Sequence, residues 1–180
     1  MKQRRVKMPV SVKGGIELRK ALRAYTPDLA KQMPKEIATA LKPVVKVAKG
    51  YLPDNGSILS GWRTRENYTG RFPLYDASTA KRGISYKTTP SKANNKGFRS
   101  LARLFNKSAA GAIYETMGRK TPSSKFVQNQ NNKYSGEFKG NNKERGRVLF
   151  RAYDEDRGAA RDGVLRAIEK ASKDFKKATA

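Results

Sequence analysis

Residues 26–48, TPDLAKQMPKEIATALKPVVKVA, carry the pattern that decides the fold class. Thr26 can cap a helix, Pro27 suits the first helical position, and Asp28 suits the first turn. Apolar side chains then recur at steps of four and three residues, which is the spacing of one helical face. These are Leu29, Met33, Ile37, Leu41, Val44, Val45 and Ala48. The pattern predicts a long amphipathic helix.

Two prolines and a turn-rich segment bear on where this helix bends and ends. Pro34 and Pro43 each remove a backbone donor, which costs about 3 kcal/mol in a helix interior. We therefore expect a kink or a break at one or both prolines. Residues 50–56, GYLPDNG, are rich in turn-forming residues and predict the end of the helix.

Shorter patterns on either side predict further elements. Residues 4–12 alternate with the period of a half-buried strand, and residues 16–25 have the pattern of a short helix. The segment 57–89 predicts strands and turns, because β-branched and aromatic residues gather at 61–65 and 83–88 between glycines and prolines.

The second half of the chain contains a polar loop, a buried segment and a helix. Residues 91–97 predict the polar loop, and residues 109–117 are apolar enough to be buried. Residues 121–146 are rich in Asn, Gln and Gly, and a structureless connection of that length is usually a functional arm or a disordered loop. The chain from 154 onward predicts the clearest helix, in which the acids at 154–156 cap the helix and complement its dipole.

These elements predict an α+β fold, in which a small antiparallel β-sheet packs against a long N-terminal helix and a C-terminal helix, with a long polar loop. A length of 180 residues fits one domain. We expect that domain to span residues 1–180, with a strand or arm at 1–15 and a flexible Asn/Gln-rich loop at 121–146. The residues that we expect to pack in the core or at a subunit interface are Trp62, Ile113, Tyr114, Val164, Ile168 and Phe175.

Charge is the strongest indication of function. The chain carries 40 Lys and Arg against 15 Asp and Glu, a net charge of +25, and no acid occurs from Ala77 to Tyr114. A chain with so large an excess of positive charge repels itself, which favours binding to an anionic partner. The candidate basic residues for contact with DNA or a partner are Lys81, Arg82, Lys87, Lys92, Lys96, Arg99, Arg103 and Lys107.

Two interpretations of this basic stretch stay open. It is either a surface that meets the phosphates of nucleic acid or a solvated loop that meets acidic proteins. No base-reading motif accompanies it, so any contact with nucleic acid should be independent of sequence.

Composition disfavours most enzyme classes. The chain has no Cys and no His, which removes disulfides, zinc fingers, thiol nucleophiles and the usual general base. The acids at 154–156 are better explained as a helix cap than as a Mg²⁺ site, and the sparse acids disfavour a Mg²⁺-dependent nuclease. No glycine spacing matches a nucleotide fingerprint. We therefore expect no catalytic residue, no metal and no cofactor.

The sequence also gives expectations about location. No apolar run approaches the roughly 20 residues of a membrane span, so no membrane partner is expected. The basic N-terminus lacks an apolar segment after it, so export through a signal peptide is not expected.

Four short motifs, taken in order, resemble a known family. They are residues 48–53, AKGYLP; 59–63, LSGWR; 109–119, AAGAIYETMGR; and 146–152, GRVLFRA. This arrangement is similar to the tail-completion (minor tail, neck) proteins of long-tailed bacteriophages. In that family a helix precedes a turn with Ser or Thr followed by Gly, then a strand with Tyr and Glu, then a terminal helix. Trp62-Arg63 departs from the family pattern, and the Asn/Gln-rich segment is longer, so completion protein, tail terminator and connector all stay open.

The resemblance implies a structural virion protein without enzymatic activity. It implies an α+β subunit, assembled in the host cytoplasm, that forms a ring, expected to be a hexamer, where the DNA-filled head meets the tail. The implied partners are the connector, the tail terminator, the tail tube and double-stranded DNA in the lumen. A stand-alone, sequence-independent DNA- or RNA-binding protein is the alternative.

Charge arithmetic limits what DNA alone can neutralise. Six subunits would carry about +150, whereas a lumen about 40 Å long holds only about 24 phosphate charges at one per roughly 1.7 Å. Some basic surface should therefore face acidic neighbours or solvent.

Overall fold

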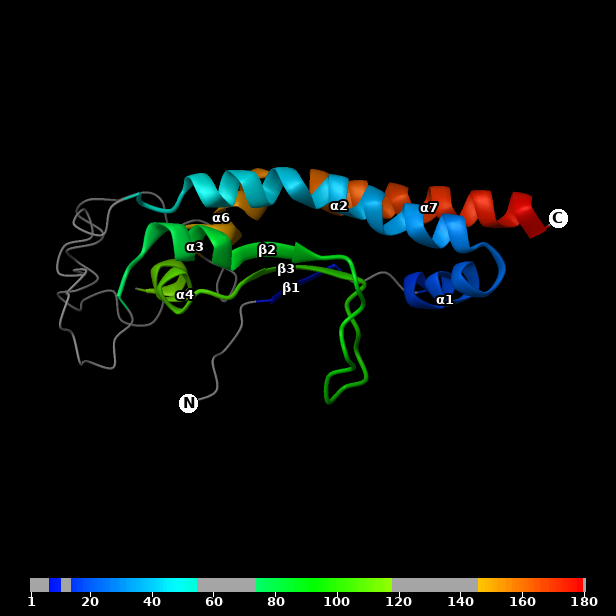
Figure 1. Cartoon of the computed structure of the whole chain (residues 1–180), viewed down its shortest axis with the longest axis horizontal. Helices are drawn as coiled ribbons and strands as arrows, with labels where there is room; N and C mark the ends of the chain where they lie inside the picture. The colour runs from blue at the N-terminus through cyan, green and yellow to red at the C-terminus, as the bar shows by residue number, and fades with distance from the viewer. Residues whose placement is uncertain (1–6, 11–13, 55–73, 118–145, 180) are drawn as a thin grey trace. The chain divides into compact units, whose positions relative to one another are not determined.

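The computed structural model of the chain describes residues 7–10, 14–54, 74–117 and 146–179 (Figure 1). It is a mixed α+β fold, which confirms the predicted class. Within the described ranges, three strands form one sheet in the order β1-β3-β2, and β2 and β3 pair antiparallel. The expected polar loop at 121–146 and the expected strand at 61–65 lie outside the described residues, apart from Gly146.

The predicted elements before residue 55 form where the patterns place them. A strand, a short helix and a long helix follow in that order, and the long helix ends at Gly50. The described elements are β1 (Lys7–Val10), α1 (Gly15–Tyr25), α2 (Pro27–Gly50), α3 (Ala77–Gly83), β2 (Ile84–Lys87), β3 (Ala102–Asn106), α4 (Ala109–Thr116), α6 (Leu149–Glu155) and α7 (Ala159–Thr179).

The chain forms two compact units. Of the described residues, the first unit contains 44–54, 74–85, 105–117 and 146–157. The second contains 7–10, 14–43, 86–104 and 158–179. Helix α2 and strands β2 and β3 each contribute residues to both units.

Helix α2 runs unbroken through both of its prolines, so the expected break is absent at Pro34 and at Pro43, and the alternative of a kink stays a prediction. The reason is burial of its apolar face. Met33, Ile37, Leu41 and Val44 are each at most 1% exposed. Burying a large apolar side chain stabilises by about 1.5–3 kcal/mol, so the four together match or exceed the cost of two prolines, about 3 kcal/mol each.

In the first unit, Glu115 of α4 and Arg147, which precedes α6, form hydrogen bonds at the ends of these two helices. The buried carboxylate of Glu115 accepts hydrogen bonds from the backbone amides of Leu149 (2.8 Å) and Phe150 (2.9 Å), at the start of α6. The buried guanidinium of Arg147 donates to the carbonyls of Tyr114 and Met117, at the end of α4. An acid at a helix N-terminus and a base at a C-terminus complement the helix dipoles. The resemblance implied a strand around Tyr114 and Glu115, and the structure corrects this to a helix.

Helix α3 is a second departure from the sequence-based expectation, because strands and turns are predicted across 57–89. Asp76 caps this helix: its carboxylate accepts a hydrogen bond from the Thr79 amide at 2.6 Å. The side chain of Thr79, then its amide, and then the Ser78 hydroxyl hold the pKa of Asp76 below its ordinary value. The strand predicted at 83–88 is present as β2.

The predicted C-terminal helix is divided, and its acids do not cap it. Asp154 and Glu155 lie in the last turn of α6, so their predicted role at a helix start is wrong. Arg157 (φ 50°) and Gly158 (φ 88°) adopt left-handed backbone conformations, which end one helix before α7 begins. Glu155 instead accepts hydrogen bonds from Arg151 (2.9 Å) and from the hydroxyl of Tyr51.

In the second unit, α7 packs closely on the first part of α2. A Cβ on Gly163 would lie 2.7 Å from the Cβ of Ala40, so only glycine permits this approach. Lys170 of α7 also forms an ion pair with Glu36 of α2 at 2.5 Å. No helix in the described ranges is long and apolar enough to cross a membrane.

Candidate functional site

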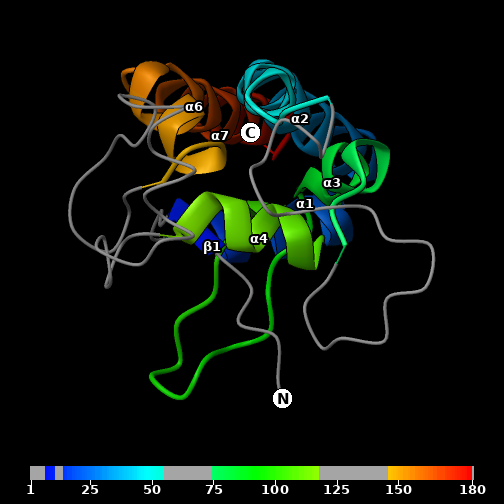
Figure 2. The same cartoon turned by 90° about the vertical axis from the view of Figure 1, so that its left-hand side faces the viewer.

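The loop that joins β2 to β3 is the strongest candidate for a functional surface. Residues 88–101 leave the sheet, project away from helix α7 and return (Figure 1, Figure 2). Every side chain from Lys92 to Arg99 is exposed. We call residues 88–101 the basic hairpin, because Lys92, Lys96 and Arg99 are its charged residues.

The tip of the basic hairpin is a defined turn. The side-chain oxygen of Asn94 accepts hydrogen bonds from the amides of Lys96 and Phe98, both at 2.9 Å. The backbone of Asn94 also bonds to Gly97 and Phe98 at 2.9 Å. Gly97 has φ of 72°, a left-handed conformation that favours glycine at this point of a three-residue hairpin turn. The tip therefore holds its backbone shape through local bonds.

The base of the basic hairpin is also anchored. Ser91 donates its amide to the carbonyl of Ser100 and accepts the Ser100 amide on its hydroxyl, both at 2.9 Å. The guanidinium of Arg19, a buried residue on α1, donates to the carbonyl of Thr88. Burial, and secondarily the charge of Arg23, lower the pKa of Arg19, although an arginine remains charged near neutral pH.

Five of the eight predicted basic residues belong to the second unit. Lys92, Lys96 and Arg99 are exposed on the basic hairpin, and none forms an ion pair with a residue that the structure describes. Lys87 is exposed at the end of β2, and Arg103 is half-buried in β3.

The other three predicted basic residues belong to the first unit, where each contacts a neighbouring side chain. Lys81 forms an ion pair with Asp54. Arg82 donates to the Thr79 hydroxyl at 3.2 Å, and the Lys107 ammonium lies 5.4 Å from the centre of the Phe105 ring. The structure thus separates the predicted stretch into three cations with partners in the first unit, three exposed cations on the basic hairpin, and Lys87 and Arg103 on the strands beside it.

The predicted packing residues differ in burial. Tyr114 and Val164 are fully buried, at 0% exposed, and Ile168 is 9% exposed. Ile113 is half-buried, as is Phe175, whose ring centre lies 6.3 Å from that of Tyr25. Trp62 lies outside the described residues.

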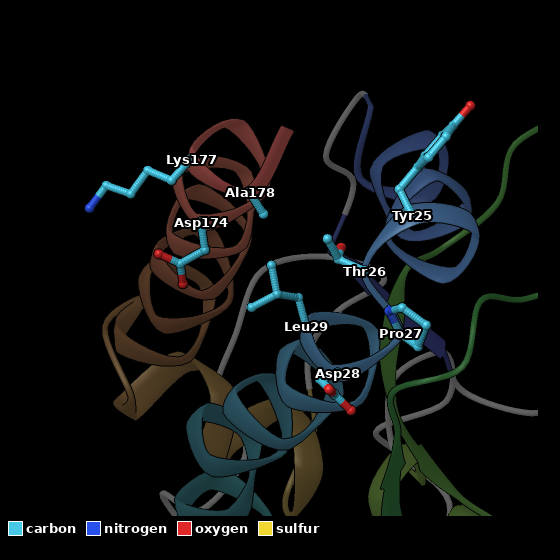
Figure 3. Close-up of a pocket in the computed structure, with 8 residues that line it drawn as sticks. All are labelled: Tyr25, Thr26, Pro27, Asp28, Leu29, Asp174, Lys177 and Ala178. Carbon is cyan, nitrogen blue, oxygen red and sulfur yellow. The ribbon is translucent and has the colours of Figure 1, made fainter. Parts of the chain in front are cut away.

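An open hollow of about 630 Å³ lies in the second unit, between the α1–α2 corner and the end of α7 (Figure 3). Its acids, Asp28 and Asp174, come from different helices and point in different directions in Figure 3. Its only other charged residue among those described is Lys177. Across the described ranges, no three acids gather in a way that could hold a metal ion. This hollow therefore lacks an arrangement for acid–base or metal chemistry.

Sequence reasoning missed the residues that shape the basic hairpin. The spacing Asn94-Asn95-Lys96-Gly97 between two strand-like segments is a hairpin signal that could have been found. Arg19 had no such signal, because its contact with Thr88 joins residues far apart in sequence.

No protein-family model, no curated protein and no solved structure matches this chain. The features of this chain that bear on function are therefore its sequence motifs, its basic hairpin and its charge.

Proposed function

We propose that this chain is a structural subunit of the head–tail connector, or neck, of a long-tailed bacteriophage. In this role it is a tail-completion protein, and copies of it form a ring that joins the DNA-filled head to the tail and surrounds the DNA path. The observation that carries the proposal is the exposed, acid-free basic hairpin on an α+β subunit of net charge +25. The order of the four family-like motifs supports the same function.

Such a subunit acts by assembling into a ring and by presenting a basic surface to DNA. A ring closes through heterologous contacts, in which one surface of each copy meets a different surface of the next. A basic surface attracts the DNA backbone without reading its sequence, because phosphate contacts carry no base information. The partners in this proposal are further copies of the chain, the connector, the tail terminator, the tail tube and double-stranded DNA.

A second candidate is a stand-alone nucleic-acid-binding protein. The absence of ion pairs at Lys92, Lys96 and Arg99 among the described residues favours it, because cations without protein partners are available to phosphates. Such a protein would act in the infected cell rather than in the particle. A tail terminator of the same neck is a variant of the first proposal.

The copy number in purified particles, measured by quantitative mass spectrometry, tests the proposal. One closed ring predicts about six or about twelve copies per particle. Hundreds of copies would indicate a repeating tail, capsid or DNA-condensing protein. Absence from the particle would reject the neck function and favour the stand-alone nucleic-acid-binding protein.

A further inference from the structure

In the described part of the second unit, the basic hairpin carries exposed cations on a segment that has no acid. From Tyr86 to Leu104 the chain has five basic residues and no acid. Helix α7, by contrast, mixes its lysines with Asp162, Glu169 and Asp174. The hairpin is therefore the stronger source of local positive potential.

We propose that the basic hairpin contacts the phosphate backbone of duplex DNA directly, through Lys92, Lys96 and Arg99. This inference rests on the proposed function and deepens it, since it names the element that meets the DNA and leaves the ring contacts to other surfaces. The contact is independent of base sequence.

The hairpin is built to present these side chains in a fixed arrangement. Asn94 and Gly97 hold the turn between Lys92 and Arg99, and the Ser91–Ser100 pair holds the two arms together. A loop that is ordered before binding loses less conformational entropy on binding. Asn94 is thus a positioning residue for the three cations.

The surroundings of the cations favour DNA over an acidic protein. Protein interfaces usually have an apolar centre rich in aromatic side chains. Between Lys92 and Arg99 the exposed residues are Ala93, Asn94, Asn95, Lys96, Gly97 and Phe98, and only Phe98 is a large apolar side chain, at 37% exposed. Lys, Arg, Asn and backbone amides are the groups that commonly bond to phosphates.

The experiment measures how affinity for a short duplex of mixed sequence depends on salt. The test variant replaces Lys92, Lys96 and Arg99 with Gln. The matched control replaces Lys173, Lys176 and Lys177 of α7, three exposed lysines, with Gln, so both variants lose three charges. A third variant, Asn94→Ala, keeps the charge and removes the side-chain bonds that hold the turn. Circular dichroism and thermal melting establish that each variant is folded.

Each phosphate contact contributes about 0.9 to the slope of log affinity against log salt. Three lost contacts should lower the slope of the hairpin variant by about 2.7. Between about 50 and 200 mM salt, the wild-type chain should then lose about 40-fold more affinity than the hairpin variant. The α7 control should keep the wild-type slope, and Asn94→Ala should bind more weakly at unchanged net charge.

Several results would overturn the inference. One is an equal fall in slope for the hairpin and α7 variants, which would mean that diffuse charge alone binds DNA. Another is no binding of duplex at the lowest salt, or binding of poly-glutamate in its place that depends on the same three residues. Loss of binding in Phe98→Ala, with single-stranded DNA preferred, would indicate stacking on unpaired bases instead.

The failure of this inference and the failure of the proposed function are distinguishable. If the hairpin variant binds duplex like the wild-type chain while particles contain one ring of copies, the neck function stands and the hairpin does not meet the DNA. If the hairpin binds duplex as expected but particles lack the chain, the contact stands and the neck function fails.

Discussion

Glu115 offers the sharpest test of how the first unit is held together. Its carboxylate is 1% exposed and accepts amide hydrogen bonds from Leu149 at 2.8 Å and Phe150 at 2.9 Å. Hydrogen bonds to a charged group contribute about 1.5–3 kcal/mol each. Glu115→Ala should therefore lower the free energy of unfolding of the first unit by about 3–6 kcal/mol.

Gly146 supplies the second half of the test. A Cβ at this position would overlap the Glu115 carboxylate and lie 3.0 Å from a ring carbon of Phe150. In Gly146→Ala the carboxylate must move and release the amides that it caps. Overpacking of this kind costs about 1–3 kcal/mol, with the lost hydrogen bonds in addition. In the double variant the overlap with the carboxylate no longer exists, so the two costs should not add.

Urea denaturation of the four proteins in this cycle gives the coupling energy, and hydrogen exchange at the Leu149 and Phe150 amides shows where stability is lost. Glu169→Ala, at an exposed position on α7, is the control for loss of one acid. We expect the control to stay within about 0.5 kcal/mol of the wild-type chain. A loss below about 1 kcal/mol in Glu115→Ala, or additive losses in the double variant, would refute the capping role of Glu115.

Three further perturbations test other parts of the fold. Gly163→Val should destabilise the second unit by about 1–3 kcal/mol, because its Cβ would lie 2.7 Å from that of Ala40. Thermal melting would measure this loss, and unchanged stability would mean that α2 and α7 separate freely. Tyr75→Phe removes the buried hydrogen bond of 2.6 Å from the Tyr75 hydroxyl to the Pro53 carbonyl. Urea denaturation should show a free energy of unfolding lower by about 0.5–1.5 kcal/mol, whereas a stabilised variant would show that this bond is unimportant. The pKa of Asp76 is lowered in the folded chain, so its cap contributes fully above the ordinary carboxyl pKa and is lost as pH falls through the lowered value. Melting temperatures across acidic pH should therefore fall less steeply in Asp76→Asn than in the wild-type chain, and identical slopes would contradict the role of this cap.

Several elements followed from local pattern alone. The seven apolar residues after Thr26 predict α2, and its end at Gly50 follows from the turn formers after it. Alternation predicts β1, β-branched and aromatic content predicts β2, and apolar spacing predicts α1 and most of α7. Such patterns predict helices and strands because each element buries one face, so apolar residues recur with the period of that element.

The eight candidate basic residues were predicted from charge alone. Sequence proximity could not show that Lys81 faces Asp54 or that Arg82 bonds to Thr79, whereas Lys92 and Lys96 stand on an exposed hairpin. Charge is a property of composition, but its availability to a partner depends on which side chains the fold brings beside it.

By itself, the sequence determined the mixed α+β class, the position of the long helix and the one-sided charge. Only the tertiary structure decided that α2 continues through Pro34 and Pro43, because burial of its apolar face compensates for the lost backbone donors. Only the tertiary structure joined Glu115 to α6 and Arg19 to the basic hairpin, because each contact links residues tens of positions apart. Local periodicity indicates which face of an element is buried. It does not indicate which residues, distant in sequence, that face or the end of the element will contact.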